Sequence, residues 1–166
     1  MKILLPVDAS SAALAPVRHL AALARRGARL EVLVLNVQPR YHLYLARFTR
    51  RAARDALRAE RSRAAMAAAI GALSRAGIRF RAVAELGRPA ERIAAVAERE
   101  AVDEILMGVG RHPGWLRWAN PSIAQGVMER IDTPVTVFAR GTESALERYG
   151  IPAGVLGLAA LLIVSD

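Results

Sequence analysis

Short apolar runs alternate along this chain with longer segments in which apolar residues recur every three or four positions. The runs are rich in Leu, Val and Ile, as in LEVLVLNV at residues 30–37. Runs of this length and composition are typical of buried β-strands. We therefore predict five strands, at Lys2–Val7, Leu30–Val37, Ile78–Ala84, Asp103–Met107 and Pro134–Ala139.

The segments between the strands have the periodicity of amphipathic helices. Gly27 and Gly77 are expected to end the first two helices, because glycine readily adopts the left-handed conformation that follows a last helical turn. Ser10 or Ser11 can cap the first helix. The predicted helices are Ala12–Arg26, Ala52–Ala76, a helix opened by Gly87–Glu91, and Ser122–Ile131.

This order of elements predicts the fold class. Strands that alternate with helices form a parallel α/β sheet with helices on both faces, here in a single domain. Ligands of such sheets bind beyond the carboxyl ends of the strands. Asp8, Val37 and Gly108 stand at strand ends that can face this crevice, and they are the first candidates for a binding site.

Composition narrows the function classes. The chain has 166 residues, is 54% hydrophobic and has no cysteine, which excludes disulfides, thiolate metal sites and cysteine nucleophiles. Its first residues lack the pattern of a signal peptide, so a cytoplasmic location is expected. The net charge of +9 favours anionic partners. However, Lys2 is the only lysine, and the abundance of arginine and alanine is also what a GC-rich genome produces without selection for a partner.

Several motifs resemble the universal stress protein family. They are KILLPVDAS, LNVQP, ELGRPAERI and the segment from DEILMGVG to PSIAQGVMERIDTPVTVF, in the family's order over residues 1–140. The resemblance implies a five-stranded parallel sheet of the Rossmann-like, adenine nucleotide alpha hydrolase-like type. It also implies a homodimer formed through the last strand, Pro134–Ala139, and a role in stress response or signalling. Residues 141–166 are then an apolar C-terminal extension.

The resemblance also implies an adenine nucleotide site. ATP-binding members have the pattern G-x2-G-x9-G-(S/T) after the fourth strand. Gly108 and Ser122 match its first and last positions, but Arg111 and Pro121 stand where two glycines are expected. Asp8 matches an acidic residue that contacts the nucleoside. The nucleotide-binding residues so implied are Asp8, Ala9, Val37, Met107, Gly108, Gly110, Arg111, Gly114, Ser122 and Ile123.

The two substitutions leave ATP binding, with or without Mg, open. A phosphate loop works through converging backbone N–H groups, and Pro121 removes one of them. Arg111 can instead bring a guanidinium to a phosphate, and Gly110 can replace the missing glycine after a one-residue shift. Either the loop binds a nucleotide in this altered form, or the chain is a nucleotide-independent dimeric interaction protein.

Three further features suggest partners. Trp115 and Trp118 either pack the loop or anchor a protein partner. Arginines recur at helical spacing from Arg47 to Arg61, but no RNA-binding aromatic motif accompanies them, so nucleic acid is not expected. The uncharged segment Tyr149–Ser165 is short for a membrane span, so packing is favoured over membrane association.

Catalysis has little support in the sequence. His19, His42 and His112 are scattered without metal-ligand spacing. Asp8 is the single carboxylate at a strand end that faces the predicted crevice. We therefore expect a binding module with no metal site, and not an enzyme.

Overall fold

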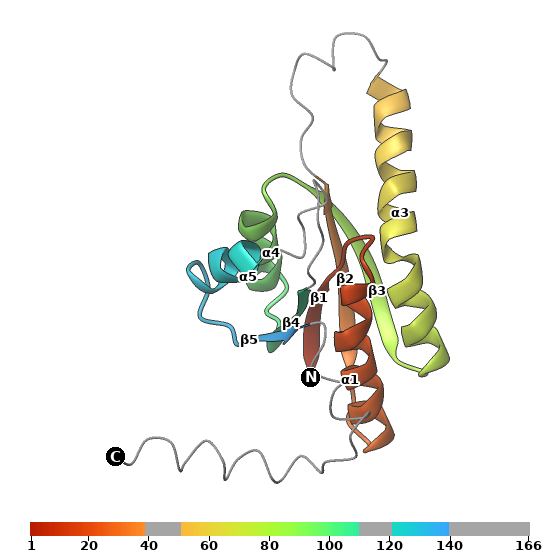
Figure 1. The fold of residues 1–166 in the computed structure, drawn as a ribbon, viewed down its shortest axis with the longest axis vertical. Helices are drawn as coiled ribbons and strands as arrows, with labels where there is room; N and C mark the ends of the chain where they lie inside the picture. The colour runs from red at the N-terminus through yellow and green to blue at the C-terminus, as the bar shows by residue number, and fades with distance from the viewer. Residues whose placement is uncertain (39–50, 110–120, 140–166) are drawn as a thin grey trace.

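The computed structural model describes residues 1–38, 51–109 and 121–139. Over these residues the chain forms a five-stranded parallel sheet in the order β3-β2-β1-β4-β5 (Figure 1). The fold class predicted from the sequence is confirmed. The strands are β1 (Lys2–Pro6), β2 (Glu31–Gln38), β3 (Arg79–Leu86), β4 (Glu104–Val109) and β5 (Val135–Ala139).

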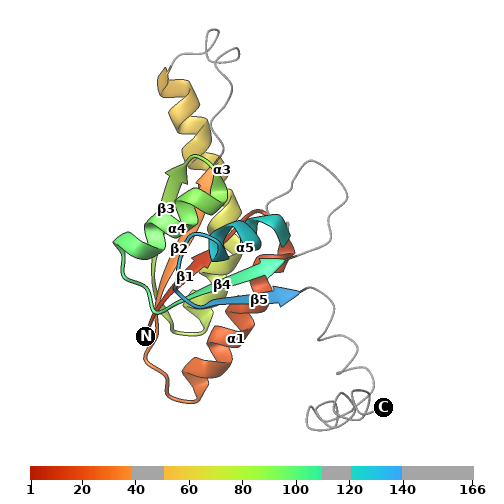
Figure 2. The same cartoon turned by 90° about the vertical axis from the view of Figure 1, so that its left-hand side faces the viewer.

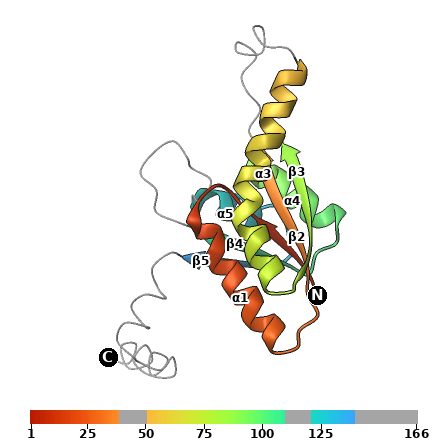
Figure 3. The ribbon, with the colours of Figure 1, turned by 90° about the vertical axis from the view of Figure 1, so that its right-hand side faces the viewer.

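Helices cover both faces of this sheet. Figures 1, 2 and 3 show α1 and α3 on one face, and α4 and α5 on the other. A short 3-10 helix, η1, links β1 to α1. The bounds are η1 (Ser11–Ala13), α1 (Leu14–Arg25), α3 (Arg51–Arg75), α4 (Pro89–Arg99) and α5 (Pro121–Met128).

Two hydrophobic cores lie on the two faces of the sheet. Ile3 and Leu5 of β1 pack with residues of α1 and α3, and Leu4 packs with residues of α4 and α5. All three side chains are fully buried. Because both faces of the central strands are covered, these strands are continuous apolar runs rather than alternating ones.

The structure corrects three details of the prediction. Strands β3 and β4 each extend two residues further than expected, so Gly108 lies within β4 and not in the following loop. The predicted capping of the first helix by Ser10 or Ser11 is wrong, because Ala13 occupies the N-cap position and no side chain caps the helix. Helix α5 ends at Met128 rather than Ile131.

An ion-pair network joins three elements at the amino end of the sheet. Glu100, just after α4, accepts bonds from Arg81 of β3 at 2.5 Å and from the Lys2 ammonium of β1 at 3.1 Å. Bonds from Arg81 and then Lys2 lower the pKa of the Glu100 carboxyl. This network fixes the end of α4 against the sheet edge.

Candidate functional site

Asp8 stands just beyond β1 at the carboxyl end of the sheet. The N–H of Val7 donates to the Leu35 carbonyl at 2.8 Å, which continues the pairing of β1 with β2 up to Asp8. The carboxylate oxygen Oδ1 of Asp8 accepts the backbone N–H of Ser10 at 2.9 Å and also the Ser10 hydroxyl. This is a local turn that an aspartate stabilises through its own side chain. It fixes the direction in which the Asp8 carboxylate points.

Gly108 allows β4 to lie against the segment that follows Asp8. A Cβ at this position would lie 2.5 Å from the carbonyl carbon of Ala12 and would overlap with its oxygen. Since the obstacle is backbone, no side-chain rotation can relieve it. The first glycine of the nucleotide pattern therefore has a packing role in this chain: it brings η1 and Asp8 close to the end of β4.

A buried polar network centred on Asn36 of β2 fixes the backbone at the end of β1. The Asn36 side chain, only 3% exposed, donates from Nδ2 to the Val7 carbonyl at 2.9 Å. Its Oδ1 accepts the Ser62 hydroxyl of α3 at 2.9 Å and the Gln38 amide at 2.7 Å. Every member of the network has a partner, as buried polar groups require. The strand and helix patterns do not predict this network, although the lone Asn in the apolar run LEVLVLNV is a sequence signal for it.

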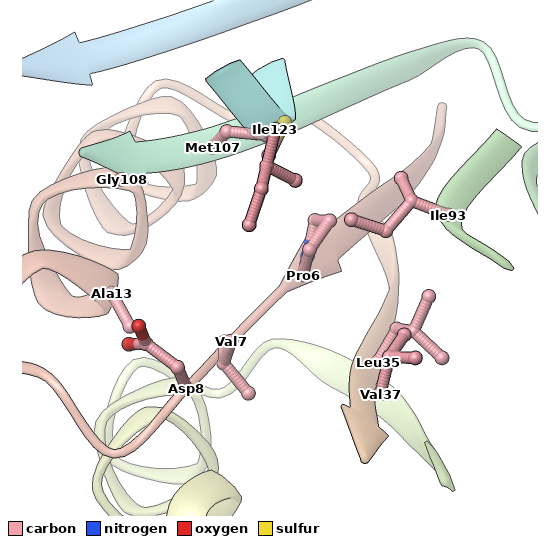
Figure 4. Close-up of a pocket in the computed structure, with 10 residues that line it drawn as sticks. All are labelled: Pro6, Val7, Asp8, Ala13, Leu35, Val37, Ile93, Met107, Gly108 and Ile123. Carbon is pink, nitrogen blue, oxygen red and sulfur yellow. The ribbon is translucent and has the colours of Figure 1, made fainter. Parts of the chain in front are cut away.

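These contacts surround a pocket at the carboxyl ends of β1, β2 and β4. Figure 4 shows Asp8 on one side, Val37 on the other, and Met107 and Ile123 above them. Among the described residues that line the pocket, Asp8 is the only carboxylate, and the other side chains are apolar. The volume that the described residues leave open is about 30 Å³. That is enough for a water molecule or two and far below the ~300 Å³ at which pockets for drug-sized ligands begin.

The structure thus brings together half of the predicted site. Asp8, Val37, Met107, Gly108 and Ile123 all line the pocket. Ala9 is exposed and is not among its lining residues. Ser122 belongs to α5, but its side chain lies outside the described residues, as do Gly110, Arg111 and Gly114.

The remaining sequence candidates do not add a catalytic group. His19 is exposed and its ring contacts that of Phe138, with 5.2 Å between the ring centroids. Over the described ranges, no three His, Asp or Glu side chains gather in a way that could hold a metal ion. His42, His112, Trp115, Trp118 and the apolar extension lie outside these ranges.

The family model for universal stress proteins matches residues 1–139. The chain belongs to the universal stress protein family. A search of curated protein sequences finds no match. Within the described part of this universal stress protein, no helix combines the length and the apolar character needed to cross a membrane.

Solved structures of the family have the same fold. The protein MJ0577 is 26% identical, with a TM-score of 0.66, over 85% of this chain and 96% of that one. An Arabidopsis thaliana universal stress protein with AMP bound is 13% identical, with a TM-score of 0.63, over 93% and 97% of the two chains. One from Archaeoglobus fulgidus in complex with dAMP is 20% identical, with a TM-score of 0.58, over 82% and 96%.

Proposed function

We propose that this universal stress protein binds an adenine nucleotide in the pocket beyond the ends of β1, β2 and β4. We further propose that it is a cytoplasmic binding module that acts in stress response or signalling. The observation that carries the proposal is a pocket with apolar walls and one carboxylate, Asp8. Apolar walls suit the faces of a purine, and a carboxylate can accept a hydrogen bond from a ribose hydroxyl. The AMP and dAMP complexes of similar proteins support the choice of ligand.

Asp8 is prepared for this role by the contacts around it. The bonds from Ser10 both go to Oδ1, so Oδ2 is the oxygen that we assign to the ribose. Gly108 and Asn36 hold the backbone on either side of the Asp8 turn. A preorganised acceptor loses little conformational freedom when the ligand arrives, and this favours binding.

The narrow pocket sets a condition on binding. A purine does not fit in about 30 Å³, so side chains in the wall must move when it enters. Met107 and Ile123 lie together over the pocket in Figure 4. Methionine is unbranched and adapts its shape easily, so we propose that Met107 moves to admit the base. ATP with Mg is the ligand we propose for the complete site, with phosphates held by the segment from Gly110 to Ser122.

The test is isothermal titration of nucleotide-free protein with AMP, ATP, Mg-ATP and cyclic AMP. We expect micromolar affinity for at least one of them. Asp8→Asn keeps an oxygen that can accept the Ser10 N–H but removes the charge, and it should weaken binding about tenfold. Glu91→Gln on the exposed side of α4 is the matched control and should change nothing. Absence of binding by all four nucleotides, or equal affinity in Asp8→Asn and wild type, would contradict the proposal.

We also propose that the chain forms a homodimer through β5. This strand is an edge of the sheet, and its Val137 side chain is 41% exposed. Met128, at the end of α5, is 50% exposed. An exposed apolar edge strand readily pairs with another chain. Val137→Lys should convert a dimer to a monomer in light scattering, whereas Phe80→Lys on the opposite edge, β3, should not. A monomeric wild type would refute this interface and leave the nucleotide proposal untouched.

A further inference from the structure

Two segments far apart in the sequence share a pattern. Residues 22–30 read ALARRGARL, and residues 72–80 read ALSRAGIRF. Both have the form A-L-x-R-x-G-x-R-x, and we call them the twin turns. Together they carry five arginines and no carboxylate. In this pattern Arg25 is equivalent to Arg75, and Arg29 is equivalent to Arg79.

The twin turns also share their backbone geometry. Gly27 and Gly77 follow α1 and α3 with φ of 89° and 67°. The N–H of the next residue then donates to a carbonyl in the last helical turn, from Ala28 to Leu23 at 3.2 Å and from Ile78 to Leu73 at 3.1 Å. These bonds engage carbonyls at the helix ends that would otherwise repel an anion. Equivalent arginines therefore leave the two turns at equivalent positions.

The two turns lie next to each other. Figures 1 and 3 show α1 and α3 ending at the end of the sheet that carries the N-terminus. A cavity of about 170 Å³ lies between the turns, and Arg29 and Arg79 are both among its lining residues. One water needs roughly 10–15 Å³ by this measure, so the cavity has room for a ligand of several atoms. It lies at the opposite end of the sheet from the Asp8 pocket.

Positive charge is in excess around this cavity. All five arginines of the twin turns are exposed, and no ion pair joins any of them to another described residue. Glu31 is the nearest carboxylate along the chain. It lies beside Arg79 in the register of β2 and β3, but no ion pair joins the two side chains. The N-terminal ammonium adds positive charge, since it donates to the Arg29 carbonyl at 3.0 Å.

We propose that the twin turns bind a phosphate-bearing anion in this cavity, held by the guanidinium groups of Arg29 and Arg79. Arginine forms strong charge-assisted bonds to phosphate oxygens, and its planar group can offer two N–H donors at once. Arg25, Arg26 and Arg75 add a positive field that attracts the anion. The phosphate can belong to a soluble molecule or to a lipid headgroup. This site is independent of the nucleotide site.

Pyrophosphate is the probe for the soluble form. It is titrated into the full chain and followed by calorimetry and by the NMR shifts of the Gly27 and Gly77 amides, with Gly108 as the reporter of the other end. We expect saturable shifts at Gly27 and Gly77. The double variant Arg29→Gln/Arg79→Gln should lose about tenfold or more in affinity, because charge-assisted bonds are lost. The control Arg63→Gln/Arg88→Gln removes the same charge elsewhere and should lose less than about twofold, since distant exposed charges are screened.

Vesicles distinguish the source of the phosphate. The protein is sedimented with phosphatidylglycerol vesicles and, separately, with phosphatidylcholine vesicles. Binding to phosphatidylglycerol vesicles only would assign the site to lipid headgroups, provided that Arg29→Gln/Arg79→Gln abolishes it and the control double variant does not. Pyrophosphate binding without vesicle binding would assign it to a soluble phosphate. Equal losses in the two double variants, shifts confined to Gly108, or no binding of either probe would overturn the proposal.

Discussion

The two ends of the sheet present different cavities. In the part of the chain that the structure describes, the carboxyl end has a pocket of about 30 Å³ with apolar walls and a single carboxylate, and the amino end has a cavity of about 170 Å³ lined by two arginines. The first is assembled from strands β1, β2 and β4 and helices α4 and α5. The second is assembled from two copies of one local turn. The carboxyl-end pocket therefore depends on contacts between distant segments, and the amino-end cavity depends on the conformation of the turns themselves.

A third turn shows that the geometry alone does not make a basic cavity. After α4, Val102 donates to the Ala97 carbonyl at 3.1 Å, as in the twin turns, and Ala101 has a φ of 47° where they have glycine. This turn lies on the other face of the sheet and carries Glu100, which is paired with Arg81 and Lys2. The same backbone conformation thus supports an internal ion pair on one face and unpaired arginines on the other.

The largest effect should come from disrupting the carboxyl end at Gly108. Gly108→Val places side-chain atoms against the Ala12 backbone and should lower the free energy of unfolding by about 3 kcal/mol or more. Chemical denaturation measures this. Gly71→Ala is the control, because its Cβ meets nothing closer than Arg75 at 3.5 Å and alanine favours the helix by about 1 kcal/mol. Equal stability of Gly108→Val and wild type would refute the assigned packing role.

Asn36→Leu should have the next largest effect. Leucine leaves the Val7 carbonyl and the Ser62 hydroxyl without their buried partner, which should cost about 2–3 kcal/mol of unfolding free energy. Ser62→Ala removes only one bond from the network and should cost less, about 1 kcal/mol. The two variants are compared by urea denaturation. If Ser62→Ala lowers the unfolding free energy as much as Asn36→Leu does, the hydrogen bond from Asn36 to the Val7 carbonyl is not the main contribution of this network to stability.

The turns at the amino end should respond to backbone strain in opposite directions. Gly77→Ala forces alanine into the left-handed region and should cost about 1 kcal/mol, although no atom lies within 4 Å of the new Cβ. Ala101→Gly relieves the same strain in the third turn and should gain about 0.5 kcal/mol, since the more flexible unfolded chain offsets part of the relief. Thermal unfolding of both variants checks this, and the same sign for both would contradict it.

The smallest effect should be a pH dependence of stability that comes from Glu100. Its pKa is lowered by Arg81 and Lys2, so the unfolded state binds a proton more readily than the folded state. The stabilisation is fully present above the ordinary glutamate pKa of about 4.3 and is lost as the pH falls through the lowered folded value. Glu100→Gln should reduce the difference in denaturation midpoint between neutral pH and about pH 3. An unchanged difference would mean that the network does not stabilise the fold.

Much of the candidate site could be predicted from the sequence. Asp8, Val37 and Gly108 were placed at strand ends by apolar runs that stop beside them, and parallel strands bring such ends together. The buried face of α4, at Ile93, Val96 and neighbouring positions, also followed from helical spacing. Capping by Ser10 or Ser11 was predicted incorrectly, because η1 intervenes before α1 and Asp8 takes up the Ser10 donors.

The amino-acid sequence by itself determined the order of the elements, the parallel sheet with helices on both faces, and the carboxyl ends of the strands as the place of the candidate site. These follow from apolar periodicity and turn residues, which act over a few neighbouring positions. Only the tertiary structure decided that Gly108 packs on Ala12, that Asn36 joins Val7 to Ser62, and that the twin turns enclose a cavity. Such contacts join residues that are distant along the chain, and the fold brings them together because it must bury two apolar layers against a single sheet.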